Sequence, residues 1–210
     1  MKVLLINGSP HRHGCTYTAL TEVASVLEEE GIETEIFWIG NKPISGCIAC
    51  KQCAKTGYCA IDDTVNECLK KARSTDGFIF GTPVHYSAVS GAMTSFMDRL
   101  FYADSRAGNR TFALKPAACV ISTRRAGATA TFDQMNKYFT NREMPIISSF
   151  YWNMVHGTNP EEVRQDVEGI STMRVLARNM AFFLKCKQVA MEHGVALPKQ
   201  EPIARMNFIH

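Results

Sequence analysis

Four cysteines lie within thirteen residues, between positions 47 and 59. Two residues separate Cys47 from Cys50 and Cys50 from Cys53, and five residues separate Cys53 from Cys59. Soft thiolates at such short spacing suit an iron–sulfur cluster or a zinc ion. Without a metal they are free thiols that can be oxidised. We predict these four residues as candidate metal ligands, with zinc and free thiols as the alternatives to a cluster.

A second group of chemically suitable residues follows the first apolar run of the chain, residues 3–6. Residues 7–16 are rich in glycine, hydroxyl groups and turn formers, and a helical pattern begins at their end. A loop of this kind directs backbone N–H groups toward a phosphate at the positive end of the helix. A Walker A loop is excluded by the spacing of Gly8 and Gly14, and Cys15 stands where its lysine would be. We predict a phosphate site here, against the alternative of an ordinary turn.

The pattern Gly-Ser-Pro-x-x-x-Gly-x-Thr at residues 8–16 resembles the FMN-phosphate loop of the flavodoxin-like NAD(P)H-dependent FMN reductases. Two further loops carry groups that suit the flavin ring that this resemblance implies. Residues 81–87 contain a rigid proline, two aromatic rings and several backbone donors, which suit the edge and face of the ring. Residues 122–128 contain two adjacent arginines whose charge would favour a negatively charged, reduced flavin. The alternatives are a plain loop and a pair of solvated surface cations. In the loop of residues 122–128 we predict contacts to the cofactor from Ser122, Arg124, Arg125 and Gly127.

The elements that would position these loops alternate between strand and helix along the chain. Apolar runs predict strands at residues 3–6, 33–38, 77–80, 116–121 and 145–150. Apolar residues at helical spacing predict helices around 20–27, 65–72, 93–100 and 132–139, and a helical segment over about 159–194 with a break near Gly169. This alternation predicts a single α/β domain over 1–210, with a flavodoxin-like, doubly wound, five-stranded parallel sheet in the order 2-1-3-4-5 and helices on both faces. In that order the three loops meet at the carboxyl ends of the first, third and fourth strands.

Three motifs resemble those of the flavodoxin-like NADPH-dependent FMN reductases, including their iron–sulfur flavoprotein branch. They are Gly8-Ser9-Pro10, Gly81-Thr82-Pro83-Val84-His85-Tyr86 and Ser87-Ala88-Val89-Ser90-Gly91, and the likeness covers about residues 1–150. The cysteine spacing also resembles the motif that binds a [4Fe–4S] cluster in iron–sulfur flavoproteins. The resemblance implies FMN as cofactor, electron transfer from a reduced nicotinamide, and a homodimer or homotetramer.

The resemblance also implies roles for individual residues. It implies that Ser9, His11, Cys15 and Thr16 hold the phosphate, and that Pro83, Val84, His85 and Tyr86 hold the ring. The family often has arginine in place of His11 and asparagine in place of Cys15, so we expect weaker or pH-dependent phosphate binding. No catalytic side chain is predicted, because the flavin itself carries the hydride chemistry.

Composition and charge narrow the class of the protein. The net charge of +3 is too small to indicate a nucleic-acid partner. It also has the opposite sign to the strongly negative charge that is usual in flavodoxins that act as electron carriers. No apolar run approaches the length of a membrane span, and no signal-peptide pattern is present, so we expect a cytoplasmic protein. Its eight cysteines are then thiols or metal ligands rather than disulfides. Cys68, Cys119 and Cys186 fall on apolar patterns, which predicts that they lie in the core.

Together these features predict an FMN-dependent oxidoreductase. It would take hydride from NADPH or NADH and pass the electrons to a flavin, quinone, nitro compound or iron–sulfur acceptor. The alternatives are a non-enzymatic electron carrier and a redox sensor based on the cysteines at 47–59. Four residues, Phe150, Tyr151, Trp152 and His156, form an aromatic patch that we expect to contact a second subunit, against the alternatives of a core cluster and a cap over the flavin of a neighbouring subunit.

Overall fold

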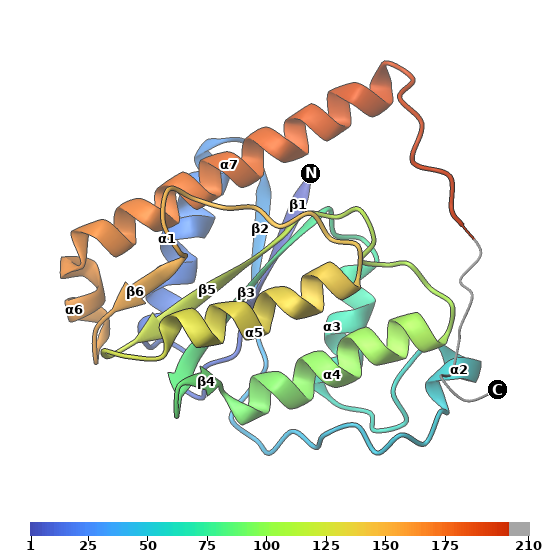
Figure 1. The fold of residues 1–210 in the computed structure, drawn as a ribbon, viewed down its shortest axis with the longest axis horizontal. Helices are drawn as coiled ribbons and strands as arrows, with labels where there is room; N and C mark the ends of the chain where they lie inside the picture. The colour runs from blue at the N-terminus through green and yellow to red at the C-terminus, as the bar shows by residue number, and fades with distance from the viewer. Residues whose placement is uncertain (202–210) are drawn as a thin grey trace.

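A parallel β-sheet runs through the middle of the structure, a computed structural model that describes residues 1–201 (Figure 1). Its strands are β1 (Lys2–Asn7), β2 (Glu33–Trp38), β3 (Gly77–His85), β4 (Ala88–Val89), β5 (Ala117–Thr123) and β6 (Met154–His156). The parallel strands lie in the order β2-β1-β3-β5-β6, and β4 pairs antiparallel with the end of β3. The predicted flavodoxin-like, doubly wound α/β fold is confirmed.

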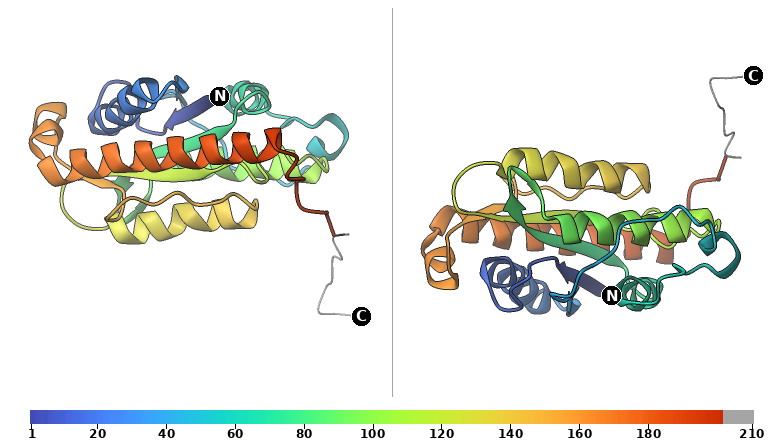
Figure 2. Two further views of the ribbon diagram at one scale, coloured as in Figure 1. Left: turned by 90° about the horizontal axis from the view of Figure 1, so that it is seen from above. Right: turned by 90° about the horizontal axis from the view of Figure 1, so that it is seen from below.

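Helices cover both faces of this sheet (Figure 2). The helices are α1 (Cys15–Glu29), α2 (Cys53–Thr56), α3 (Thr64–Ala72), α4 (Gly91–Arg106), α5 (Ala128–Asn141), α6 (Pro160–Gln165) and α7 (Val167–Glu192). Side chains of α1, α6 and α7 share one apolar core with the sheet, and those of α3, α4 and α5 share the core on the opposite face. Within the described residues, no helix has both the length and the apolar character that crossing a membrane requires.

The first strand shows why its sequence is apolar without interruption. Leu4 and Ile6 point into the core beneath α3, α4 and α5, whereas Val3 and Leu5 point into the core beneath α1 and α7. All four side chains have no exposed surface. A central parallel strand is covered on both faces, so the alternation of polar and apolar residues seen in half-exposed strands is absent.

Side-chain caps fix where several helices begin. Asp63 accepts a hydrogen bond from the Val65 N–H at 3.0 Å and starts α3, and Ser90 caps α4 in the same way. Asn159 accepts from the Glu162 N–H at 2.9 Å, and Pro160 occupies the first turn of α6. These residues satisfy N–H groups that have no partner inside the helix.

Two predicted strand features differ from the structure. The first difference is β4, which forms because Tyr86 and Ser87 both adopt left-handed backbone conformations and reverse the chain after β3. The second is the last strand, for which the prediction of 145–150 was wrong. Around Ile146 the chain forms only an isolated β-bridge with Ala117 and then leaves the sheet. It rejoins the sheet as β6, a strand of three residues.

The C-terminal helices also differ in detail from the prediction. The break lies at Asp166 rather than at Gly169, because the Asp166 carboxylate caps α7 by accepting the Gly169 N–H at 2.9 Å. A side chain at position 169 would collide with that carboxylate. Cys68 and Cys119 are buried as predicted, but the prediction for Cys186 was wrong. It is exposed on the C-terminal part of α7, beyond Leu184, the last buried residue of that helix.

Candidate functional site

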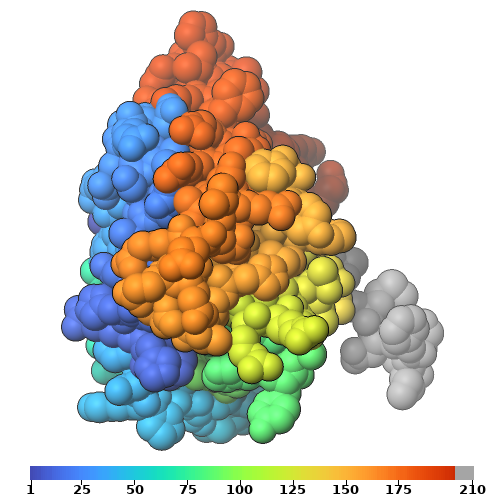
Figure 3. Space-filling model, turned by 90° about the vertical axis from the view of Figure 1, so that its left-hand side faces the viewer, coloured from blue at the N-terminus to red at the C-terminus, as the bar shows by residue number. Residues whose placement is uncertain are grey.

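Three loops meet at the carboxyl edge of β1, β3 and β5. Figure 3 shows their surfaces gathered on one face of the molecule, beside α6. The Gly8 N–H donates to the Gly81 carbonyl at 2.8 Å, which joins the first loop to β3. The hydroxyls of Thr16 and Ser122 lie 2.7 Å apart in a buried hydrogen bond, which joins the first loop to the third. The predicted convergence of the three segments is therefore present in the fold.

Two glycines allow this close approach of the first loop to β3. A Cβ at Gly8 would lie 2.7 Å from the Met93 sulfur and 2.9 Å from the Gly81 carbonyl oxygen. A Cβ at Gly81 would lie 2.8 Å from side-chain carbons of both Leu20 and Thr16. Both positions therefore require the smallest residue for close packing.

The first loop is held open by local hydrogen bonds. The Ser9 N–H donates to Asn7 Oδ1 at 3.1 Å, and the Ser9 hydroxyl accepts from the His11 N–H at 3.2 Å. The Trp38 indole N–H donates to the Ser9 carbonyl at 2.8 Å. The Arg12 guanidinium lies over the same indole ring, 5.6 Å from its centre. Trp38 thereby fixes the loop from the end of β2.

Backbone N–H groups of this loop remain available to a ligand. The N–H groups of residues 12, 13 and 15–17 donate to no acceptor within residues 1–201. No acidic residue lies in the first turn of α1, where a carboxylate would repel an anion. Five free donors at the start of a helix form an arrangement that suits a phosphate.

The side chains predicted to hold the phosphate lie in different environments. His11 is exposed, and Ser9 is almost fully buried beneath the loop. Cys15 is half-buried, with its sulfur 3.7 Å from the Gly157 carbonyl, and burial raises the pKa of its thiol. Thr16 is 1% exposed, and its hydroxyl forms a hydrogen bond with the Ser122 hydroxyl. The side chains of Thr16 and Ser122 therefore connect the first loop to the third.

The second loop is the tight hairpin between β3 and β4. Pro83 and Val84 are half-buried at its base, and His85 is exposed near its tip. Tyr86 and Ser87 have φ values of +50° and +59°. Non-glycine residues with a positive φ have a strained backbone, and such strain is found most often at ligand sites. The Tyr86 side chain is fully exposed and lies at the same edge of the sheet as the first loop.

The third loop packs directly against this hairpin. Gly127 has a φ of +90°, and a Cβ built on it would lie only 2.6 Å from the Ser87 Cα. Arg124 and Arg125 are exposed just before it. Glycine at 127 is therefore required both by the backbone conformation and by the contact, and it brings the arginines beside the hairpin.

The four cysteines of the second candidate site line one pocket against α4. Cys47 and Cys50 are exposed, Cys59 is half-buried and Cys53 is buried at the start of α2. Burial raises the pKa of the Cys53 thiol, and the charge of the other three sulfurs raises it further. Within residues 1–201, no three His, Cys, Asp or Glu side chains are arranged to hold a single metal ion.

The backbone around these cysteines is unusually rich in free donors. The N–H groups of residues 47–53 form no hydrogen bond with the rest of the described chain. Ala49 and Lys51 have φ values of +52° and +61°, so left-handed residues alternate through the segment. Alternation of this kind makes concave arrays of N–H groups that bind anions, including iron–sulfur clusters.

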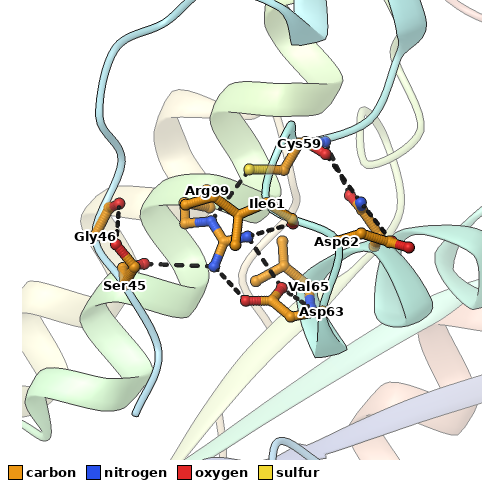
Figure 4. A network of polar contacts seen from close by, with 9 residues as sticks. Ser45, Gly46, Cys59, Ile61, Asp62, Asp63, Val65 and Arg99 are labelled. Atoms are coloured by element: carbon orange, nitrogen blue, oxygen red, sulfur yellow. Dashed lines mark hydrogen bonds and ion pairs between the residues drawn. The ribbon is translucent and has the colours of Figure 1, made fainter.

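A buried arginine supports the cysteine pocket from α4 (Figure 4). Arg99 donates to Cys59 Sγ at 3.2 Å and forms a two-point ion pair with Asp63 at 2.7 and 3.0 Å. Burial opposes its charge, but the hydrogen bonds to Asp63 and Cys59 outweigh that effect and raise the pKa of Arg99. Neither Arg99 nor Trp38 was predicted from the sequence as a site residue. The available signal for Arg99 was a charged residue at helical spacing between Phe96 and Ala103, on the apolar face of a helix.

Comparisons with known proteins agree with this arrangement. The family model described as NADPH-dependent FMN reductase matches residues 1–159. An iron–sulfur flavoprotein of Methanocaldococcus jannaschii is 33% identical over 194 residues, which cover 88% of this chain and 98% of the relative.

Solved structures agree on the fold. RosB, solved with bound 8-demethyl-8-formylriboflavin-5'-phosphate, matches with a TM-score of 0.68 and 14% identity, over 100% of this chain and 92% of its own. The NAD(P)H:(acceptor) oxidoreductase FerB of Paracoccus denitrificans matches with a TM-score of 0.63 and 14% identity, over 88% of this chain and 97% of its own. The chain belongs to the NADPH-dependent FMN reductase family, in the branch that includes the iron–sulfur flavoproteins.

Proposed function

We propose that the protein is an FMN-dependent oxidoreductase that takes hydride from NADPH or NADH and passes the electrons to a flavin, quinone, nitro compound or iron–sulfur acceptor. The observation that carries this proposal is the convergence of the three loops, with free backbone donors in the first. FMN, when bound, supplies the hydride acceptance and electron release. The protein supplies binding, orientation and charge.

The first loop fits the FMN phosphate through its backbone. The N–H groups of residues 12, 13 and 15–17 have no competing acceptor within the described chain. The Ser9 hydroxyl accepts from the His11 N–H, so its own proton is free to donate to a phosphate oxygen. Thr16 contributes its N–H, while its hydroxyl keeps the third loop in place.

The second and third loops fit the ring. Residues 83–86 present the hairpin at the open edge of the sheet, and Arg124 and Arg125 lie exposed nearby. Two cations near the pyrimidine end of the ring stabilise negative charge there. His85 and Tyr86 are exposed, which suits contact with the nicotinamide or the acceptor.

The cysteine pocket fits a [4Fe–4S] cluster by the chemistry of its donors. Cys47, Cys50, Cys53 and Cys59 line the pocket as free thiols, and the unpaired N–H groups of residues 47–53 suit the negative charge of a cluster. A cluster, when bound, supplies one-electron transfer. The segment lies against the C-terminal half of α4, whereas Ser90 at the other end of α4 contacts Gly8 in the first loop. Ser90 and Arg99, which contact the first loop and the cysteine pocket respectively, are nine residues apart, or about 14 Å along the axis of α4.

Flavin titration followed by turnover tests this function. We expect protein stripped of flavin to bind FMN with one site per chain, and the loaded protein to oxidise NADPH or NADH when an acceptor is added. Menadione and nitrofurazone serve as acceptors of two different classes, and heat-denatured protein is the control. Tight FMN binding without oxidation of either nucleotide would contradict the reductase assignment.

A second candidate function, the electron carrier, is favoured by the cysteine pocket. A carrier that holds a cluster and FMN would exchange single electrons with protein partners and would be nearly inert toward free nucleotides. The same turnover assay separates the two functions, because a carrier needs an added reductase.

We also propose that two or more copies of the chain associate. Phe150, Tyr151 and Trp152 are 57%, 49% and 48% exposed in the segment that leaves the sheet before β6. Three neighbouring exposed aromatic side chains are typical of contact surfaces. Light scattering should give a dimer or tetramer mass, and Trp152→Ser should lower that mass toward one chain.

A further inference from the structure

Arg99 is a buried charge in the middle of α4. Its side chain has no exposed surface, and the free energy of burying an isolated charge is large. Such a residue is tolerated only where hydrogen bonds and an opposite charge satisfy it. The position of those partners therefore shows what the arginine holds in place.

All the hydrogen-bond partners of Arg99 lie in residues 45–63, the segment that carries the four cysteines. Its Nη1 donates to the Ser45 carbonyl at 3.4 Å and to Asp63 at 2.7 Å, and its Nη2 donates to the Ile61 carbonyl at 2.8 Å. Ser45 precedes the first cysteine, and Ile61 and Asp63 follow the last. One guanidinium therefore ties both ends of the segment to α4 (Figure 4).

The remaining donor of Arg99 reaches a cysteine sulfur directly. Nε donates to Cys59 Sγ at 3.2 Å. Hydrogen bonds to the sulfurs and the net charge around a cluster set its reduction potential. A cluster held by four thiolates is negative, and reduction adds one electron and one further negative charge. The fixed positive charge of an arginine that donates to a ligand sulfur therefore stabilises the reduced form of the cluster more than the oxidised form.

We propose that Arg99 is the positioning residue of the cysteine pocket: it holds Cys59 in place and raises the reduction potential of the bound cluster. The inference rests on the proposed assignment of a [4Fe–4S] cluster to the four cysteines. Asp63 has the opposite effect on the potential, because its carboxylate partly cancels the charge of Arg99.

The test compares variants of the anaerobically purified, cluster-reconstituted full chain. Arg99→Gln removes the charge, Arg99→Lys keeps the charge but lacks the forked donors, and Asp63→Asn removes the opposing charge while Oδ1 still caps α3. Arg178→Gln, on the exposed side of α7, is the matched control. Iron and sulfide per chain, FMN per chain, and the midpoint potential from a dithionite titration followed by electron paramagnetic resonance are measured for each.

We expect Arg99→Gln to lower the potential, Asp63→Asn to raise it, and Arg178→Gln to leave it unchanged. The expected size is roughly a tenfold change in the ratio of oxidised to reduced cluster at a fixed potential, which is about 59 mV for one electron. Arg99→Lys should lie between wild type and Arg99→Gln. If Arg99→Gln loses iron but keeps FMN, the holding role is supported, and the sign is then taken from Arg99→Lys and Asp63→Asn.

Different failures separate the two proposals. Wild-type protein that retains FMN but takes up no iron and sulfide would overturn the cluster assignment and this inference with it. Wild-type protein that carries a cluster, while Arg99→Lys and Asp63→Asn keep its potential, would overturn the role of Arg99 alone. A lower potential in Asp63→Asn would contradict the electrostatic argument.

Discussion

Replacing Gly127 by alanine tests whether the second and third loops act as one binding surface. The added Cβ would lie 2.6 Å from the Ser87 Cα, and ordinary contacts begin at 3.4 Å. The hairpin must therefore shift by about 0.8 Å, or the third loop must move away by the same amount. A misplacement of about 1 Å costs a catalytic site up to roughly 100-fold in rate, and a shift of similar size between these loops should also weaken their contacts with FMN.

The same substitution also strains the backbone. Gly127 has a φ of +90°, and a residue with a Cβ loses about 1–2 kcal/mol in that left-handed region. Gly31 provides the matched control, because its φ is +78° and nothing lies within 4 Å of an added Cβ. Gly31→Ala therefore carries the backbone strain without the contact, at the far end of α1.

FMN titration and thermal unfolding distinguish the two effects. We expect both variants to lose roughly 2–8 °C in Tm, since 1 kcal/mol corresponds to about 2–4 °C in a chain of this size. Only Gly127→Ala should weaken FMN binding, with Kd raised about tenfold or more. If Gly127→Ala binds FMN like wild type while losing as much Tm as Gly31→Ala, the two loops do not form a joint site.

Three further predictions follow from charge and burial. Arg125→Ala should lower the two-electron midpoint potential of bound FMN by up to about 20 mV, since one unit charge at about 4 Å in water contributes about 1 kcal/mol; an unchanged potential, as expected for Arg178→Ala, would remove Arg125 from the site. Burial raises the pKa of the Cys68 and Cys119 thiols, so iodoacetamide at neutral pH should label exposed Cys186 in the native protein and leave both unlabelled in mass spectra. Labelling of either before unfolding would contradict the packing. Burial opposes the ionisation of Glu35, but hydrogen bonds with Lys71 and Lys2 outweigh it and hold the pKa below the ordinary 4.5. The stability from these contacts is present above about pH 4.5 and is lost as the pH falls through the lower folded pKa. Glu35→Gln should therefore lower Tm at neutral pH and flatten its fall on acidification, and an unaltered pH profile would show that the contacts contribute nothing measurable.

The fold class and the three loops were predictable because their signals are local. The apolar run of residues 3–6 marks a strand covered on both faces, and Asp63 and Asn159 mark helix starts by the hydrogen bonds they make two or three residues later. Parallel strands then bring loops that are far apart in the sequence to one edge. Neither step depends on details of packing.

The features that sequence reasoning missed depend on tertiary contacts. Tyr86 and Ser87 adopt left-handed conformations without a glycine, so no turn signal announces β4. The position of β6 is set by which residues can pair with β5. The main-chain carbonyl of Asn153 accepts a hydrogen bond from the Ile121 N–H at 2.9 Å and returns the chain to the edge of β5. Arg99 has its charge partner 36 residues earlier in the chain. Spacing along one helix marks it as unusual but does not identify what it holds.

The visible spectrum of anaerobically purified protein, recorded after FMN addition and removal of unbound flavin, shows directly whether the three loops bind FMN. We expect the two absorption bands of flavin at one FMN per chain, with added brown absorbance, iron and acid-labile sulfide where the cysteine pocket is loaded. Protein that retains no flavin after this treatment, while its circular dichroism shows it folded, would contradict the assignment of the three loops as an FMN site.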